Sequence, residues 1–469
     1  MVAGPQAPSV DGTTIDDRRE VGRSRRAAVP RSSLAELVVP TRDPVAAVLA
    51  DDTGRDADLV PVRHHRMSAS AFTFYRGSAG LMAGDLAAGT STGLTVQLCG
   101  DAHLSNFGLF ATPERRLTFD LNDFDETHPG PWEWDLKRLA ASVHLAAAAA
   151  GHTPEEIERS VRSSAQAYRR RMALYAETRT LDVWYDAVDL DTSLPSVRRA
   201  ENRRILEGVM DRARRRTGER AAARLTEPGP EPGTIRFRSD LPLMWRLVDE
   251  AGTGDRERDL QRLDAVMARY RRTLSPERAA LLGQFRTVDI ARKVVGVGSV
   301  GTRCWIVLLQ GPQGADDVVI LQAKESGSSA LEPFTAPSGF ATNGERVVRG
   351  QRLMQAAGDP FLGFTEPEDD AADAYVRQLW DMKGSIEADT LGSKALEGYA
   401  RLCGAVLARA HARSGMAPEI SGYLGRKGKA DRALVEFARR YAAVATEDHE
   451  QFTQAIADGR VDARPDRTV

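Results

Sequence analysis

Two polar loops on either side of a short apolar run are the strongest constraint on how this chain can fold. The first loop reads Gly100-Asp101-Ala102-His103-Leu104-Ser105-Asn106, and the second reads Asp123-Phe124-Asp125. The run between them, Leu117 to Leu121, is typical of a β-strand. Phosphoryl transfer needs a carboxylate to orient a hydroxyl nucleophile, an amide oxygen to bind magnesium and a further carboxylate to bridge metal and phosphate. The spacing therefore predicts the catalytic half of a kinase-like site.

A glycine-rich loop and a lysine much later in the chain supply the other half. Gly296, Gly298 and Gly301 precede the strand-like run Trp305 to Leu309. A glycine-rich loop that joins two strands favours a loop that covers phosphates over a Rossmann turn, because glycine lets the backbone approach phosphate oxygens closely. Lys324 ends a hydrophobic strand, as the phosphate-pairing lysine of a kinase does. Taken singly, these features also fit a plain hairpin and a solvated strand end.

The partner of Lys324 is less constrained by the sequence. A helix is predicted after the lysine strand, and Glu345 on that helix is the expected ion-pair partner of Lys324. Glu325 and Glu332 are also available nearby.

Composition limits the class of protein and its partners. The 469 residues suggest two or three packed subdomains. The net charge of −2 provides no basic field for nucleic acid or an anionic membrane, so neither is an expected partner. Three scattered cysteines fit a reducing cytoplasm, and the N-terminus lacks the apolar segment of a secretion signal. We therefore expect a cytoplasmic protein, with its oligomeric state open.

Shifts in pattern divide the chain into five segments. Short apolar runs broken by glycine predict strands and loops around the acidic loops, and denser Arg and Ala content predicts helices after them. The expected segments are a largely disordered tail (1–58), the catalytic-loop and metal-site part of the large lobe (59–150), a helical block that shapes the acceptor pocket (151–285), a small nucleotide-binding lobe (286–385) and C-terminal helices of the large lobe (386–469).

The two polar loops resemble those of a known group of kinases. Gly100-Asp101-x-His103-x-x-Asn106 resembles the catalytic loop of aminoglycoside phosphotransferases and choline-kinase-like enzymes, and Asp123-Phe124-Asp125 resembles their metal-binding motif. Asp135-Leu136 matches the structural Asp-Leu that follows in those families. One departure is Cys99, where those enzymes commonly carry histidine. From Val60 to Phe452, the chain is identified as a member of the bacterial domain of unknown function 2252 family.

The resemblance implies a role for each matching residue. It implies Asp101 as the catalytic aspartate, Asn106 and Asp123 as magnesium ligands, and ATP and Mg²⁺ as the cofactors. Asp125 is a further metal-ligand candidate, or it supports the ligands, as Asp120 could.

The order of the motifs is reversed relative to ordinary kinases, in which the glycine-rich loop precedes the catalytic loop. Tyr375 to Leu379 and Asp381 to Ser385 are expected to form the last strand of the small lobe and the hinge, and Leu407 to His411 resembles the helix that normally precedes the catalytic loop. The sequence therefore predicts an α+β, two-lobed protein kinase-like fold that is circularly permuted and carries a large helical insertion. Termini that are exposed and adjacent make such a permutation tolerable. The hypothesis requires Asp101 and Lys324 to share one site.

The expected function is an ATP- and magnesium-dependent phosphotransferase acting on a small-molecule hydroxyl acceptor. Three alternatives stay open. They are a nucleotide-binding pseudokinase, an enzyme that transfers AMP, and a metal-dependent hydrolase whose metal would be remote from Lys324. The hydrolase would be built on Asp101, His103, Asp120, Asp123 and Asp125.

Arg76 is a separate candidate. It precedes a glycine-rich turn, and its side chain could either clamp a phosphate or form a buried salt bridge with an acidic loop residue. The sequence does not favour one of these roles over the other.

Overall fold

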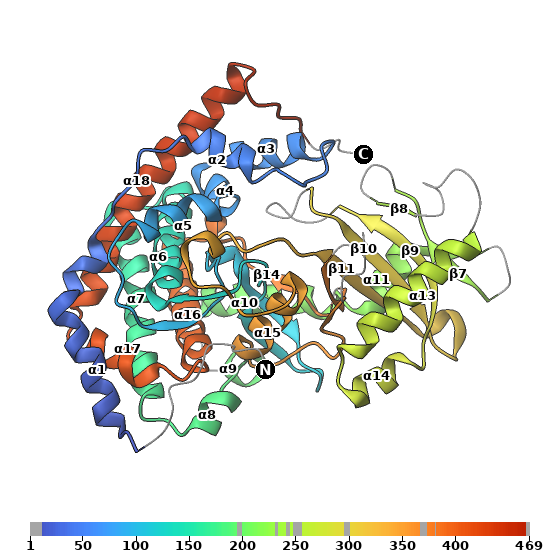
Figure 1. Cartoon of the computed structure of the whole chain (residues 1–469), viewed down its shortest axis with the longest axis horizontal. Coiled ribbons are helices and arrows are strands. Elements are labelled where there is room, and N and C mark those ends of the chain that lie inside the picture. Colours follow the sequence, from blue (N-terminus) through green and yellow to red (C-terminus); the bar gives the residue numbers. More distant parts are fainter. Residues whose placement is uncertain are drawn as a thin grey trace.

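The computed structural model describes residues 12–194, 199–229, 233–240, 244–246, 256–294, 301–365, 373–379 and 381–465. The fold is α+β, with several antiparallel sheets among many helices. Helices gather on one side of the molecule, which we call the helical lobe (residues 12–214 and 384–465). The largest sheet lies on the other side, in the sheet lobe (residues 218–379) (Figure 1).

The helical lobe contains the beginning and the end of the described chain. Its helices are α1 (Ile15–Ala28), η1 (Arg31–Ala35), α2 (Pro44–Ala50), α3 (Val60–Ser68), α4 (Ala71–Arg76), α5 (Ala79–Ala87), η2 (Leu104–Asn106), α6 (Trp132–Ala149), α7 (Pro154–Tyr175), α8 (Thr180–Tyr185), α9 (Leu190–Ser193), α10 (Ala200–Arg214), η6 (Ala388–Thr390), α16 (Ser393–Ala412), α17 (Ala417–Leu424) and α18 (Lys429–Ala457). Its strands are β1 (Thr95–Leu98), β2 (Phe107–Ala111), β3 (Leu117–Leu121), β4 (His128–Pro131), β5 (Val188–Asp189) and β14 (Gly384–Ser385).

The sheet lobe is built on six antiparallel strands in the order β12-β13-β11-β10-β9-β8. Its strands are β6 (Thr226–Pro228), β7 (Ile235–Phe237), β8 (Met244–Arg246), β9 (Arg286–Lys293), β10 (Cys304–Gln310), β11 (Val318–Glu325), β12 (Gly363–Thr365) and β13 (Ala374–Gln378). Its helices are α11 (Gly218–Leu225), α13 (Arg256–Arg272), α14 (Pro276–Leu282), η4 (Gly314–Asp316), η5 (Glu332–Phe334) and α15 (Asn343–Met354).

Strand alternation explains why this sheet is covered on both faces. Ile306 and Leu308 of β10 pack with α11, whereas Val307 and Leu309 pack in the cluster of α13 and α14. Successive side chains of a strand point to opposite faces, so a run that is apolar at every position needs a cover on each side.

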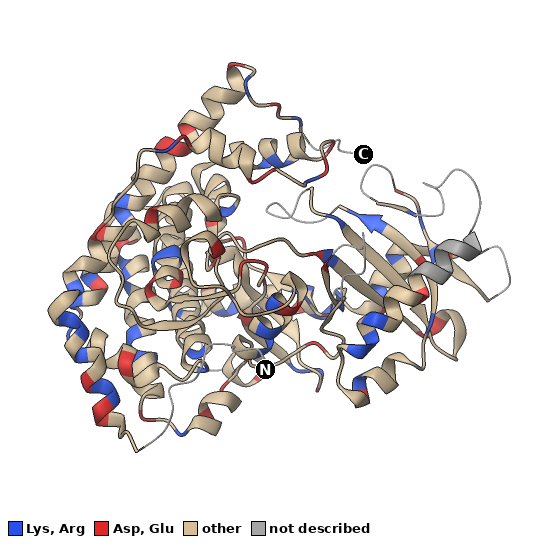
Figure 2. Cartoon of the chain, in the orientation of Figure 1, with Lys and Arg blue, Asp and Glu red and all other residues tan. Residues whose placement is uncertain are grey.

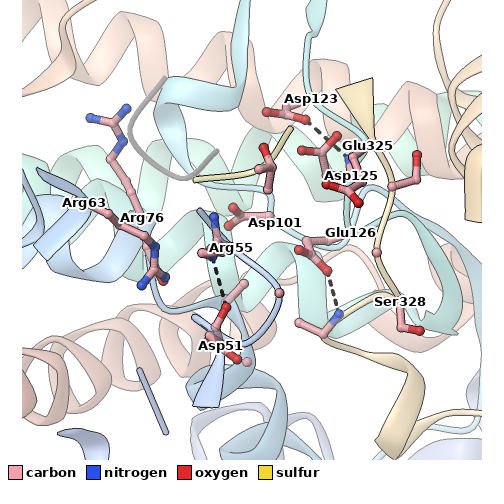
Figure 3. A pocket seen from close by; sticks show the side chains of 18 of the residues that line it. Asp51, Arg55, Arg63, Arg76, Asp101, Asp123, Asp125, Glu126, Glu325 and Ser328 are labelled. Atoms are coloured by element: carbon pink, nitrogen blue, oxygen red, sulfur yellow. Dashed lines mark hydrogen bonds between the residues drawn. The ribbon is translucent and has the colours of Figure 1, made fainter. Parts of the chain in front are cut away.

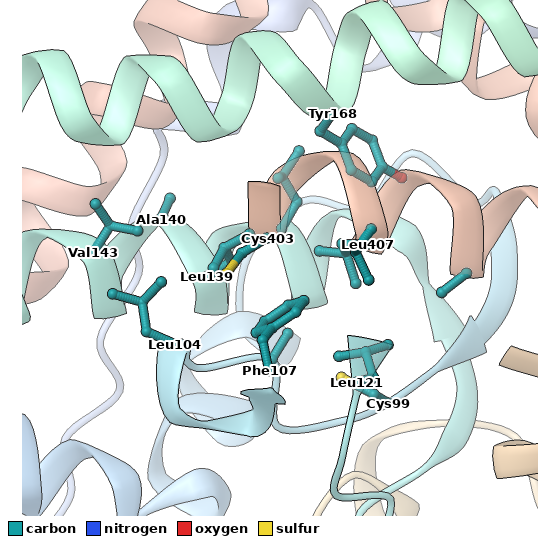
Figure 4. Packing of buried hydrophobic residues seen from close by; sticks show 14 of the residues in the cluster. Cys99, Leu104, Phe107, Leu121, Leu139, Ala140, Val143, Tyr168, Cys403 and Leu407 are labelled. Carbon is teal, nitrogen blue, oxygen red and sulfur yellow. The ribbon is translucent and has the colours of Figure 1, made fainter. Parts of the chain in front are cut away.

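The core of the helical lobe positions the predicted catalytic loop. Helices α6, α7 and α16 pack over strands β2 and β3, and Phe107, Leu139 and Leu407 meet in one buried cluster (Figure 4). Helix α7 begins with a capping box in which Thr153 and Glu156 satisfy each other's backbone N–H groups. Phe107 of β2 pairs with Leu121 of β3, so the two polar loops lie at the same end of this hairpin, beside the core.

The N-terminal segment is not a disordered tail over residues 12–58. Helix α1 is capped by Thr14 and Asp17, and Arg18 forms an ion pair with Glu419 of α17. A Cβ added at Gly22 would lie 1.8 Å from the Glu419 carbonyl oxygen, so the two helices touch backbone to backbone. Composition rich in arginine and glycine concealed this packing, because the partner helix lies near the other end of the chain.

Two further predictions for the arrangement were wrong. The apolar run Phe72–Tyr75, which was expected to be a strand, lies in helix α4. Residues 151–285 are not one helical block, because α7 packs against α16 in the helical lobe while β8 extends the large sheet. The long-range partners of these elements, and not their local composition, decide where each of them lies.

Charge is spread evenly over both lobes. Figure 2 shows basic and acidic residues mixed on most helices, in keeping with the net charge of −2. In the residues that the structure describes, no helix combines the length and apolar character needed to cross a bilayer.

Helices α7 and α16 approach so closely that one glycine should be irreplaceable. A Cβ at Gly404 would lie 2.2 Å from the Ser164 backbone oxygen, so Gly404→Ala must push the helices apart. We expect a loss of about 2 kcal/mol in the free energy of unfolding, measured by urea denaturation. Gly398→Ala on the same helix is the control, because its Cβ meets only the movable Asn202 side chain. Equal stability of the two variants would contradict the packing.

Lys137 should make stability depend on pH. It lies buried on α6 with Nζ 4.5 Å from the centroid of the Phe437 ring, and burial lowers its pKa to about 8, although Glu133 partly opposes this. Between about pH 8 and the ordinary pKa of 10.5, the unfolded chain holds a proton that the folded chain lacks, so stability rises with pH.

The variant Lys137→Met removes this titration. We expect its free energy of unfolding at pH 7 to exceed that of wild type by an amount on the order of 3 kcal/mol, since each pKa unit corresponds to about 1.36 kcal/mol. The difference should shrink between pH 8 and 10.5 in urea unfolding at several pH values. A difference that stays constant over this range would show that the ammonium of Lys137 is not destabilised by burial.

Candidate functional site

The first polar loop begins at a glycine that no other residue could replace without strain. Gly100 follows β1 with φ +85°, and an added Cβ would lie 2.0 Å from the Glu126 carbonyl oxygen. The left-handed backbone and the close approach both require glycine. This residue brings the first loop directly against the second.

Asp135 holds the start of the loop in place. Its buried carboxylate accepts hydrogen bonds from the backbone N–H groups of Cys99, at 2.8 Å, and Gly100, at 3.1 Å. The ring nitrogen Nε2 of His411, on α16, lies 3.1 Å from the same carboxylate. The thiol of Cys99 is itself buried in the core, so the polar contact at Asp135 comes from a histidine distant in sequence.

The Asp101 carboxylate is held between a cation and a neutral histidine. Nε of Arg138 donates to Oδ1 of Asp101 at 2.7 Å, and Nε2 of His103 lies 3.5 Å from Oδ2. Burial, reinforced by Arg76 and Arg138 although Asp101 opposes them, lowers the pKa of His103 to about 3. His103 is therefore neutral at physiological pH, and Arg138 is the cation that balances Asp101.

Asn106 closes the first loop through its amide. Nδ2 of Asn106 donates to the backbone carbonyl of Asp101 at 2.7 Å. The amide oxygen is then the end of the side chain that could bind a cation.

The second polar loop meets the sheet lobe at Lys324. Nζ of Lys324 donates to Oδ2 of Asp125 in a short ion pair, and only 3% of the Lys324 side chain is exposed. Burial alone would lower the pKa of Lys324, but the Asp125 and Asp123 carboxylates raise it above its usual range. In turn, Lys324 holds the pKa of Asp125 below its usual value against the effect of burial.

Asp123 lies beside this pair. Its Oδ1 accepts from the backbone N–H of Asp125 at 3.3 Å, and burial together with the Asp125 charge raises the pKa of Asp123. The structure thus brings Asp101, Asn106, Asp123, Asp125 and Lys324 to one place, although Lys324 lies 199 residues from Asp125.

Glu345 is not brought to Lys324. Oε1 of Glu345 lies 3.4 Å from Nε of Arg349 on the same helix, α15, while Lys324 pairs with Asp125. The neighbouring Arg346 makes the contact from α15 to the acidic loop, donating to the backbone carbonyl of Thr127 at 2.6 Å. The expected pair does not form because the carboxylate that reaches Lys324 comes from the second polar loop, which is distant in sequence, and not from the helix that follows the lysine strand.

The glycine-rich loop can be followed only at its end. Gly296 and Gly298 lie outside the described residues. Gly301 has φ +89°, and its carbonyl accepts from the backbone N–H of Asp56 at 2.8 Å. Arg292 of β9 also pairs with Asp56, so the segment between α2 and α3 touches both flanks of this loop.

These groups line a cavity of about 600 Å³ between the lobes. Asp101, Asn106, Asp123 and Asp125 lie on its wall, together with Glu126, which burial shifts to a pKa of about 7. Figure 3 shows the carboxylates facing a group of arginines across the cavity. Oxygen ligands for a divalent cation and cations suited to phosphate therefore share one solvent-filled space.

The sequence interpretation missed the groups that support this site. Arg138 lies three residues after Asp135 on α6, one helical turn along, and this spacing was the available signal. Asp120 is not a metal-ligand candidate, because its carboxylate forms a buried ion pair with Arg409. The hydrolase hypothesis required Lys324 to be remote from the acidic loop, and the contact with Asp125 removes that arrangement.

Comparison with known proteins identifies a family. A family model described as "Uncharacterized protein conserved in bacteria (DUF2252)" matches residues 55–455. Because the match covers most of the chain, the protein belongs to this family. No curated protein and no solved structure matches it.

The Lys324–Asp125 pair should be energetically asymmetric. The Lys324 side chain is 3% exposed, whereas that of Asp125 is 32% exposed. Asp125→Asn strands a buried ammonium and should cost about 3 kcal/mol of unfolding free energy, while Lys324→Met leaves a carboxylate that water can reach and should cost less. Urea unfolding of both single variants and the double variant measures the coupling. Additive effects, or a larger loss from Lys324→Met, would contradict the ion pair.

Proposed function

We propose that this DUF2252 protein is an ATP- and magnesium-dependent phosphotransferase that acts on the hydroxyl group of a small molecule, and that it has a circularly permuted protein kinase-like fold. The observation that carries the proposal is the contact between Lys324 and Asp125 at the cavity of Asp101 and Asn106. Two sets of residues that are far apart in the sequence, each expected from phosphoryl-transfer chemistry, meet there.

The order of elements in the sheet lobe supports the fold. Strand β9, the glycine-rich segment, β10, the lysine strand β11, helix α15 and strands β12 and β13 follow one another as in the small lobe of a kinase. After β13 the chain crosses to β14, which pairs with β2 of the helical lobe through Gly384 and Leu109. This crossing is where a hinge is expected.

A second contact supports the permutation. The backbone N–H of Gln97, just before the catalytic loop, donates to Oγ of Ser414, just after α16, at 3.0 Å. His411 near the end of α16 also contacts Asp135, which holds Cys99. The end of the proposed preceding helix and the start of the loop are thus neighbours in space, as a cut between them requires.

The residues divide the chemistry between them. In the proposed reaction the acceptor oxygen forms a bond to the γ-phosphorus of ATP, and the bond from this phosphorus to the β–γ bridging oxygen breaks, which releases ADP. Asp101, fixed by Arg138, orients the acceptor hydroxyl and accepts its proton, while Lys324 balances the charge of the nucleotide phosphates. Lys324 must exchange part of its contact with Asp125 for phosphate, so nucleotide binding would rearrange this pair.

The donor set at the second loop fits magnesium. Within the described ranges, no three His, Cys, Asp or Glu side chains are grouped as a metal site. Magnesium, however, is bound through one or two carboxylates together with phosphate oxygens and water, and Asn106 and Asp123, with Asp125 beside them, offer oxygen ligands of that kind. When bound, the ion would neutralise phosphate charge.

The proposal is tested by nucleotide-dependent stabilisation. ATP with magnesium should raise the unfolding temperature of the wild type. At an ATP concentration of a hundred times the dissociation constant, the free energy of unfolding should increase by about 2.7 kcal/mol. The gain should fall sharply with chelator, in Asp123→Asn and in Lys324→Met. Asp316→Asn, an exposed acid on η4, is the matched control and should keep the full shift.

Three results bear on the alternatives. No shift at saturating nucleotide, or an undiminished shift in Lys324→Met, would overturn the nucleotide site. Label transferred from α-phosphate-marked ATP would replace phosphoryl transfer with AMP transfer. Binding without transfer of label from either position, over many acceptors, would favour a pseudokinase.

A further inference from the structure

The cavity has two walls of opposite charge. Asp123, Asp125, Glu126 and Glu325 lie on one side, and Arg55, Arg63 and Arg76 lie on the other together with Asp51, with Asp101 between the two sides (Figure 3). The arginines come from the segment that holds α3 and α4, whereas the acids come from the second polar loop and the end of β11. Among the described residues, the segment 151–285 contributes nothing to the lining, contrary to the expectation that it shapes the acceptor pocket.

Two of the three arginines are held by the protein itself. Arg63 donates to Oδ1 of Asp52 and to the Gly77 carbonyl, both at 2.7 Å. Arg55 donates to the Asp51 carbonyl at 3.0 Å. These contacts keep the basic wall in place.

Arg76 differs from its neighbours. Its guanidinium lies 5.8 Å from the centroid of the Phe72 ring, and its Nε, like that of Arg63, is buried without a hydrogen-bond partner. Arg63 and Arg55 each pair with Asp52, whereas Arg76 forms no ion pair in the described part of the chain. The arginine guanidinium has five N–H donors, and a buried donor that forms no hydrogen bond costs free energy. A half-buried arginine at the wall of a cavity with unused donors is suited to an anion that enters from the cavity.

The position of Arg76 separates it from the nucleotide groups. The charges that act on it most strongly are those of Asp101 and Asp389, whereas Asp125 and Asp123 act on Lys324. In Figure 3, Arg76 and the second polar loop, with Asp123 and Asp125, lie on opposite sides of Asp101. A molecule whose hydroxyl reaches Asp101 from the side of Arg76 would place its remaining groups beside Arg76.

From this geometry we propose that Arg76 binds an oxyanion, phosphate or carboxylate, of the acceptor, so that the acceptor is an anionic hydroxyl compound and not a polyamine-like cation. This inference rests on the proposed function only in identifying the bound anion as part of the acceptor. The anion site itself rests on Arg76 and the cavity. A bidentate contact of the guanidinium with an oxyanion would fix the hydroxyl at Asp101.

The test uses simple anions on the full chain with the nucleotide site filled. Wild type saturated with a non-hydrolysable ATP analogue and magnesium should be stabilised further by inorganic phosphate or by acetate, compared with chloride at equal ionic strength, and the stronger anion identifies the group. Arg76→Gln should weaken this anion binding at least tenfold and keep the analogue shift. Arg162→Gln, on the surface of α7, should keep both shifts.

The outcomes separate the two proposals. No anion effect in wild type, or the same effect in Arg76→Gln, overturns the anion site. If the anion effect is lost in Lys324→Met but kept in Arg76→Gln, the anion binds beside the nucleotide groups, and this result also overturns the anion site at Arg76. Failure of the analogue to bind counts against the proposed function only, because the anion titration can be repeated without nucleotide.

A chemical measurement on the wild type covers the case in which Arg76→Gln does not fold. Phenylglyoxal modifies free guanidinium groups, and mass spectrometry locates the modified residue. Phosphate should slow the modification of Arg76 in wild type. Modification of Arg76 at an unchanged rate would overturn the inference without any variant.

Discussion

A lysine with almost no exposed surface can keep its charge only beside a carboxylate, and the pairing of Lys324 with Asp125 ties the two lobes together at this point. Other bonds surround it. The Ala330 N–H donates to the Glu126 carboxylate at 2.6 Å, and Arg346 donates to the Thr127 carbonyl. Because all three contacts reach the same short acidic loop, the position of that loop relative to the sheet is fixed, and the cavity exists as a consequence.

Asp135 fixes the position of the first polar loop, as Lys324 fixes that of the second. Its carboxylate accepts hydrogen bonds from two backbone N–H groups and contacts Nε2 of His411. Nδ1 of His411 in turn lies 2.8 Å from the hydroxyl oxygen of Tyr168. Buried polar groups satisfied in this way specify one arrangement, since each alternative leaves a donor or acceptor unpaired. The loop of Asp101 is thus positioned from helices α6, α7 and α16, whereas the second polar loop is held by Lys324, Ala330 and Arg346 of the sheet lobe.

The sequence predicted local features well and distant contacts poorly. Strand β3 was found at Leu117–Leu121, and β10 and β11 were found to within a few residues, because apolar runs bounded by turn residues are local signals. Asp101, Asn106, Asp123 and Asp125, which spacing and the family resemblance singled out, line one cavity. Lys324 pairs with Asp125 and not with Glu345, and Arg138 was missed, because both pairs join residues that only tertiary packing brings together. The packing of α1 on α17 was hidden for the same reason.

The central claim is that residues from both lobes form one nucleotide site with a divalent cation. The most direct measurement is an anomalous difference map from crystals grown with manganese and a non-hydrolysable ATP analogue. The account predicts a peak within about 2.2 Å of oxygen atoms of Asn106 and Asp123, with the triphosphate beside Lys324. An ordered nucleotide elsewhere on the molecule, or a manganese peak away from both residues, would contradict it.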